Sequence, residues 1–150
     1  MSGNVQPQFT RQGNITGVNV LAANTTSDGS GGTVGTNIYL AFTADATNGS
    51  YVEFARIQAV GSTAATATNA TVIRIYVSSV TSGSTTTSNT HLVAEIAIPA
   101  ITTDQTTTAN NWYDVPLGFR LPAGWGILAS THIVNVAATA WRVIVFGGDY

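Results

Sequence analysis

Two residues of this chain have the types expected of a hydrolase nucleophile and its base. Ser130 and His132 lie two positions apart in an apolar stretch with strand character, so they share one face of a strand. Nucleophilic catalysis also needs an acid that orients the histidine and a strained turn that exposes the serine, and the G-x-S-x-G pattern of such a turn is absent. We therefore interpret both as polar positions on a sheet face and predict that the chain is not an enzyme.

Metal-ligating side chains are present, but their spacing does not favour a metal site. There is no cysteine, the two histidines are far apart, and no carboxylates follow the alternating pattern of a calcium loop. Carboxylates in loops more often bond their own backbone in turns. We therefore predict neither a metal nor a cofactor. The residues considered are His91, His132, Asp28, Asp45, Asp104 and Asp114.

A glycine-rich stretch at residues 29–35 is the remaining candidate for a ligand-binding loop. Phosphate-binding loops are followed by a lysine and a helix that cradle the anion. This chain contains no lysine, and no helical period follows the glycines. The stretch is therefore predicted to be a flexible loop.

Charged residues make up only 8% of the 150 residues, against about 25% in an average protein. The formal net charge is −2 and no basic cluster is present, which argues against a nucleic-acid partner. No apolar run reaches the ~18 residues of a membrane span, and the first residues lack a signal-peptide pattern. We expect synthesis and use without Sec-type export and without a membrane partner.

Segments of strand character recur along the chain between stretches rich in Gly, Ser, Thr and Asn. They predict an all-β domain, a β-sandwich or barrel of about eight antiparallel strands with little helix. The polar residues 1–13 show neither strand nor helix period and predict an extended N-terminal arm, followed by a single domain at 14–150. The predicted strands are residues 15–23, 37–43, 51–60, 71–78, 91–98, 112–115, 119–121, 127–134 and 140–146.

Alternation along these strands assigns side chains to faces. In 71–78, Arg74 and Tyr76 are expected to point away from the apolar face, whereas in 91–98 Leu92 is expected on it. The strand 140–146 is apolar on both faces apart from Arg142, so it is either central in its sheet or covered by a partner. The ion pairs expected across strands are Glu53 with Arg74, and Glu95 with Arg142 or Arg56.

Sheet edges are usually protected by lysine, inward-pointing charge or proline, and here such protection is sparse. The edges and outer faces are therefore expected to be covered by copies of the chain or by a larger surface. Aromatic and arginine side chains supply much of the energy at such contacts. The candidate interface residues are Phe9, Arg11, Trp112, Tyr113 and Tyr150; Trp112 packing on its own sandwich is the alternative.

The stretch LPAGW, residues 121–125, leads into the predicted strand 127–134. Pro122 fixes one φ angle, while Gly124 and Gly126 permit turns that a larger residue resists. Trp125 between them can fold back against the end of the sandwich. We interpret these four residues as a structural turn, with a ligand-binding loop as the alternative.

The C-terminal third, GFRLPAGWGILASTHIVNVAATAWRVIVFGGDY, resembles the jelly-roll proteins that decorate, or cement, the capsids of tailed bacteriophages. The resemblance is carried by LPAGW, by the strand ILASTHIV, and by TAW leading into RVIVFGGDY, and similar patterns occur in phage tail and fibre modules. It implies a jelly-roll β-sandwich, made in the host cytoplasm and located on the outer surface of the virion. The implied partners are the major capsid protein and the chain itself, as a homodimer or homotrimer.

This resemblance implies a structural virion protein that bridges neighbouring capsid subunits and stabilises the shell. A receptor- or glycan-binding module of a phage tail or fibre is the alternative, because β-sandwiches with exposed aromatic residues also bind sugars. A third reading, a depolymerase or esterase, lacks the carboxylate pair or triad that it requires.

Overall fold

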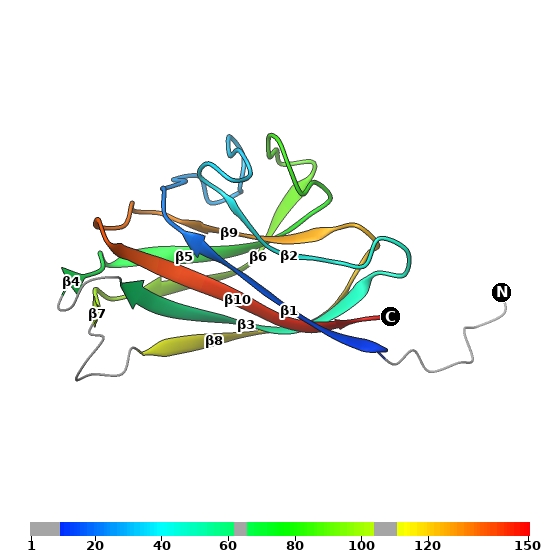
Figure 1. Ribbon diagram of the computed structural model, residues 1–150. Coiled ribbons are helices and arrows are strands. Elements are labelled where there is room, and N and C mark those ends of the chain that lie inside the picture. Colours follow the sequence, from blue (N-terminus) through cyan, green and yellow to red (C-terminus); the bar gives the residue numbers. More distant parts are fainter. Residues whose placement is uncertain (1–9, 62–65, 104–110) are drawn as a thin grey trace, which may run out of the picture.

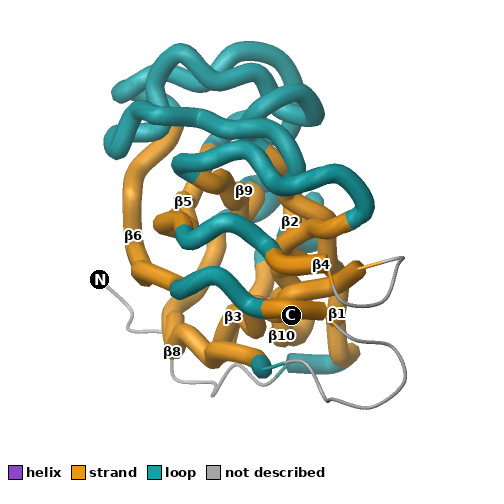
Figure 2. The backbone as a smooth tube through the Cα atoms, turned by 90° about the vertical axis from the view of Figure 1, so that its left-hand side faces the viewer, coloured by secondary structure: helices purple, strands orange, loops and turns teal. Residues whose placement is uncertain are grey.

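The computed structural model describes residues 10–61, 66–103 and 111–150, which contain strands but no helix. Two antiparallel four-stranded sheets lie face to face, with strand orders β1-β10-β3-β8 and β2-β9-β5-β6 (Figures 1 and 2). A third sheet consists of the short strands β4 and β7. The strands are β1 (Gln12–Val20), β2 (Tyr39–Thr43), β3 (Ser50–Gly61), β4 (Thr66–Ala67), β5 (Thr71–Ser78), β6 (Thr90–Ile98), β7 (Thr102–Thr103), β8 (Trp112–Leu121), β9 (Gly126–Thr131) and β10 (Thr139–Asp149).

The prediction of an all-β sandwich of about eight antiparallel strands is confirmed. Two details differ. The segments 112–115 and 119–121 belong to one strand, β8. The register of its pairing with β3 shifts near Gly118, which has a φ of 66°, and the pairing continues on both sides of the shift. The strands β4 and β7 are two-residue pairings too short to show alternation in the sequence.

The large strands pair in a nested way when β4 and β7 are left aside. β1 pairs with β10, β2 with β9, β3 with β8, and β5 with β6, so the chain folds as one long hairpin whose successive pairs alternate between the two sheets. The β10–β3 and β5–β9 ladders then complete the sheets. Wrapping of this kind is compatible with the jelly roll implied by the resemblance, which stays a prediction.

β10 is central, with β1 on one side and β3 on the other. Its inward residues Trp141, Val143 and Val145 are fully buried between the sheets. Its outward residues Ile144 and Phe146 are only half-buried. The inward apolar face of β10 is therefore explained by the central position of the strand, which buries it between the sheets. The outward apolar face stays partly open.

The outer face of the second sheet is covered by the chain itself. Segments 21–38 and 79–89 lie over it (Figure 1), and Tyr76, Ile38 and Leu128 form a small second core beneath them. The expectation that Arg74 and Tyr76 point away from the apolar face is confirmed, since both lie on the outer side of this sheet, but the covering segments bury them there. The expectation that Leu92 lies on the apolar face is wrong, because a bulge at Val93 sets it opposite Tyr76, on the outer face.

The glycine-rich stretch is a loop and belongs to this cover. Gly29 and Gly32 are buried, and a Cβ on Gly32 would lie 2.5 Å from the Thr85 hydroxyl. Thr85 donates a hydrogen bond of 2.6 Å to the carbonyl of Gly29, which joins the two covering segments.

β1 begins inside the segment expected to form the N-terminal arm. Gln12 and Gly13 pair with Asp149 and Gly148, and the Arg11 N–H donates to the carbonyl of Asp149 at 2.7 Å. Residues 1–9 lie outside the described residues.

The LPAGW stretch forms a hydrogen-bonded turn between β8 and β9. The Trp125 N–H donates to the carbonyl of Pro122 at 3.1 Å, and Gly124 has a φ of 72°. The Trp125 carbonyl accepts from the N–H of Ala44 at 2.8 Å, which ties the turn to the end of β2. The half-buried Trp125 ring packs against the main core, and a Cβ on Gly126 would lie 2.8 Å from Leu40.

Replacing Trp125 with alanine is expected to lower the free energy of unfolding by about 2 to 3 kcal/mol, below the cost of removing a fully buried tryptophan, because the ring is half-buried. Chemical denaturation measures this. The matched control is Trp112→Ala, which removes a largely exposed ring and should cost about 0.5 to 1 kcal/mol. Equal costs for the two substitutions would show that Trp125 does not support the core.

Candidate functional site

The outer face of the β1-β10-β3-β8 sheet is the strongest candidate for a functional site. Residues that share this face come from three neighbouring strands: Phe146 of β10 lies opposite Phe54 of β3, and Arg56 of β3 lies opposite Asp114 of β8. Trp112 lies opposite Gln58, two positions before Asp114, and therefore on the same side of β8 as Asp114. We call the set Phe54, Arg56, Trp112, Asp114 and Phe146 the aromatic face.

Arg56 organises the aromatic face. Its guanidinium donates two hydrogen bonds of 2.7 Å to Asp114, from Nε to Oδ1 and from Nη2 to Oδ2. The same group lies 5.3 Å from the ring centre of Trp112 and 5.8 Å from those of Phe54 and Phe146. The two phenylalanine rings are stacked, with centres 4.4 Å apart and planes 13° apart. The bidentate pair and the three rings thus hold one another in fixed orientations.

This face combines apolar exposure with little uncompensated charge. Trp112 is 55% exposed, and Ile15, which lies opposite Phe146 on β1, is 61% exposed. No described residue covers the aromatic face in the way that segments 21–38 and 79–89 cover the other sheet (Figure 1). Contiguous apolar surface with aromatic and arginine side chains is the chemistry of macromolecular contact sites.

Hydrogen bonding lowers the pKa values of three carboxylates, those of Asp114, Asp45 and Asp28. The two bonds from Arg56 hold the pKa of Asp114 below its usual range, and Asp114 in turn raises the pKa of Arg56. Backbone N–H groups of Asn48 and Thr47 lower the pKa of Asp45, and Ser30 lowers that of Asp28. Asp45 and Asp28 thus accept bonds within their own turns.

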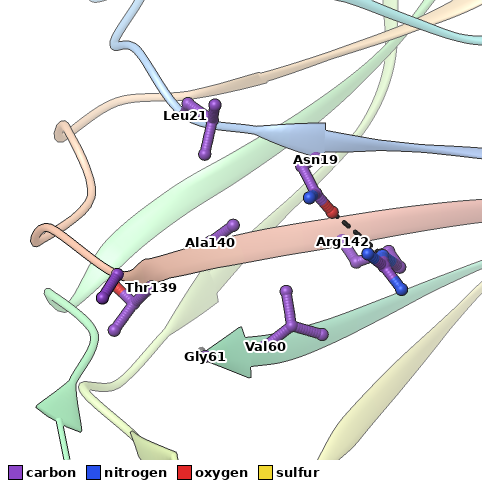
Figure 3. Close-up of a pocket in the computed structure, with 8 residues that line it drawn as sticks. Asn19, Leu21, Val60, Gly61, Thr139, Ala140 and Arg142 are labelled. Carbon is purple, nitrogen blue, oxygen red and sulfur yellow. Dashed lines mark hydrogen bonds between the residues drawn. The ribbon is translucent and has the colours of Figure 1, made fainter. Parts of the chain in front are cut away.

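A shallow depression of about 350 Å³ opens at one end of the same sheet face (Figure 3). It lies where β1, β3 and the beginning of β10 come together. Arg142 stands at its border, and its Nε donates to Oδ1 of Asn19 on β1 at 2.9 Å. The apolar part of the lining consists of Leu21, Val60, Ala138 and Ala140.

The structure separates the residues expected to form an interface. Trp112 lies on the aromatic face, whereas Tyr113 points inward and packs against the core. The guanidinium of Arg120 lies over the ring of Tyr150, 4.4 Å from the centre of that ring. Arg11 is exposed beside the first residue of β1, and Phe9 lies outside the described residues.

The expected ion pairs are wrong in their partners. Arg74 pairs with Glu95 at 2.9 Å, because β5 and β6 are neighbours, and Glu53 lies on β3 in the other sheet. Arg56 pairs with Asp114, not Glu95, for the same reason. The strand order, which sequence patterns do not contain, determines these pairs.

Ser130 and His132 do not form a nucleophile–base pair. The buried Ser130 hydroxyl bonds the hydroxyl of Tyr76 at 3.1 Å, and Nδ1 of His132 lies 3.4 Å from Nη1 of Arg74. Since a guanidinium only donates, Nδ1 must be the acceptor there. Within residues 10–61, 66–103 and 111–150, His, Asp and Glu side chains nowhere gather in a group of three that could hold a metal.

The centre of the aromatic face, formed by Phe54, Arg56 and Phe146, was not predicted from the sequence. A signal was present: residues 54 and 56 alternate with the core residues Ala55 and Ile57, and Phe146 lies on the second apolar face of its strand.

No family model, no curated protein and no solved structure matches this chain. In the described part of the chain, no helix has the length and hydrophobicity required to cross a membrane.

Titration of the Asp114 carboxyl carbon by NMR is expected to give a midpoint below that of an ordinary aspartate. Replacing Arg56 with glutamine should raise this midpoint toward the ordinary value, because the two donated bonds are lost. The pair's contribution to stability is present above the unfolded-state pKa and is lost as pH falls through the depressed folded pKa. Asp45 is the internal control, and an equal change there would contradict a local effect of Arg56.

Proposed function

We propose that this chain is a non-enzymatic structural protein of a phage virion that binds the outer capsid surface and stabilises the shell by bridging major capsid subunits. The observation that carries the proposal is the aromatic face, which no described residue covers, on one sheet of a sandwich whose other outer face is covered by its own loops. The nested pairing of the strands supports the jelly-roll assignment, which agrees with the resemblance in the C-terminal third.

The size of the face favours attachment at several points. Four strands about 4.8 Å apart and 9 to 12 residues long present roughly 700 Å². A standard stable interface buries about 800 Å² on each partner. One such contact is therefore weak, and an oligomer that engages several capsid sites gains about 10² to 10⁴ in apparent affinity. A homodimer or homotrimer on a repetitive shell meets this requirement.

Glycan binding by a tail or fibre module is the second candidate, and one observation favours it. The exposed ring of Trp112 lies beside the planar groups of Arg56 and Asp114, an arrangement on which a sugar ring can stack. Saturable binding of the isolated protein to a glycan array, with no binding to shells, would select this function.

Replacing Trp112 with alanine is expected to weaken binding to shells of a phage that encodes this chain by about tenfold or more, because an exposed aromatic anchor is lost. Co-sedimentation with purified shells measures occupancy. Leu92→Ala, which removes an exposed apolar side chain from the other sheet, is the matched control and should bind normally.

Binding should also persist at about 1 M salt, since most of the contact is apolar. Complete release between about 0.05 M and 1 M salt, or equal occupancy of the Trp112→Ala and wild-type proteins, would contradict the proposal.

Deletion of residues 1–9 is expected to reduce shell occupancy while leaving the free energy of unfolding nearly unchanged. Stopping at residue 9 retains the ladder between β1 and β10, which a deletion through residue 13 would shorten. Denaturation and co-sedimentation of the same preparation check both parts. Unchanged occupancy would remove the N-terminal segment from the attachment mechanism.

A further inference from the structure

The depression at the end of the β1-β10-β3-β8 sheet is bordered by Arg142, a cation that no carboxylate among the described residues compensates. Arg56 is paired with Asp114 and Arg74 with Glu95, while Arg120 lies over the ring of Tyr150. Arg142 has only the neutral amide of Asn19 as a hydrogen-bond partner among the described residues. Its other cross-strand neighbour, Gln58, is also neutral.

The bond to Asn19 orients the guanidinium of Arg142 through Nε and leaves its two Nη groups for a ligand. Asn19 accepts from Nε, and no described residue accepts from either Nη atom (Figure 3). The two N–H groups at the end of the guanidinium, one on each Nη atom, therefore point in parallel toward a ligand. A carboxylate can accept one hydrogen bond from each of them with its two oxygens. A guanidinium cannot accept a hydrogen bond, so its natural ligand here is an anion.

The rest of the lining fits a short aliphatic stem better than a sugar. Leu21, Val60 and Ala140 supply apolar walls. Two of the polar groups nearby are already engaged: Oδ1 of Asn19 accepts from Arg142, and the Thr139 hydroxyl donates to the carbonyl of Val136 at 2.8 Å. The several hydroxyl groups of a sugar acid would compete for the few polar groups that remain, whereas the methylenes of a glutamate or aspartate would contact the walls.

We propose that this depression is a socket for the side-chain carboxylate of an aspartate or glutamate on the protein that docks against the aromatic face. The depression opens on the same sheet surface, so a segment covering Trp112 and Phe54 can extend into it. That the docking protein is a capsid subunit rests on the proposed function; the preference for a protein carboxylate does not.

A titration of the ¹⁵N-labelled full-length protein tests the socket directly. The probe is the capped dipeptide acetyl-leucyl-glutamate amide, and its glutamine counterpart is the neutral control. Saturable shifts of the Arg142 Nε–H signal and of the backbone signals of Val60 and Ala140, in the millimolar range, are expected for the acidic probe alone. Glucuronic acid tests the other source of a carboxylate: binding at least as tight as that of the peptide would overturn the choice of a protein ligand.

Variants then separate charge from geometry. Arg142→Gln should weaken peptide binding by about tenfold or more, and Arg142→Lys by about three- to fivefold, because an ammonium retains the charge but lacks the parallel donors. Arg120→Gln, which removes one positive charge elsewhere on this sheet, should bind like the wild type. Equal losses for Arg142→Gln and Arg120→Gln would show general electrostatic attraction and overturn the socket.

Shell co-sedimentation with the same variants distinguishes the two proposals. A loss of about tenfold for Arg142→Gln supports both. Normal occupancy of Arg142→Gln on shells that bind the wild type would overturn the socket while leaving the proposed function intact. Peptide binding that requires Arg142, together with no attachment of wild-type protein to shells, would support the socket and overturn the proposed function.

Discussion

The ladders that β10 forms with β1 and β3 determine how the rest of this molecule is organised. A strand with apolar residues on both faces is stabilised by cover on both sides, and since both edges of β10 are paired, only its faces remain to be covered. The inward face is covered by the second sheet, where Trp141, Val143 and Val145 are buried. On the outward face, the stack of Phe146 on Phe54 shields part of the surface and leaves the remainder open.

Both sheets carry apolar side chains on their outer faces, and the two faces differ in how these side chains are covered. The outer face of the β2-β9-β5-β6 sheet carries Tyr76 and Leu128, and the chain covers them with segments 21–38 and 79–89. The hydrogen bond from Thr85 to Gly29 holds these segments together. The outer face of the β1-β10-β3-β8 sheet carries comparable apolar side chains without any such cover among the described residues. This asymmetry distinguishes an internal core from a surface that another molecule can cover.

Much of the fold was predictable, because it depends on local alternation. The bounds of β5 follow directly from the pattern in residues 71–78. Features that depend on tertiary arrangement were not predictable: nothing local indicates the loops that bury Arg74 and Tyr76 on the outer face, and Glu53 was paired with a residue of the wrong sheet. The site shows the same division. Trp112 was identifiable as an exposed aromatic candidate, but its contact with Arg56 exists only because Gln58 and Trp112 lie opposite each other in the β3–β8 ladder.

The two arginines of the open sheet face differ in how they would respond to being covered. The charge of Arg56 is compensated by two bonds to Asp114, so a partner can remove water from it without leaving an unpaired ion. Among the described residues Arg142 has only an amide as its partner, so covering it without a carboxylate would bury an unpaired cation at a cost of several kcal/mol. Apolar contact with the aromatic face is available to many surfaces, and this penalty disfavours those that lack an acid at the right position. In a docked complex of the kind proposed, the stacked rings would supply attraction, and Arg142 would supply discrimination among the surfaces that the face can contact.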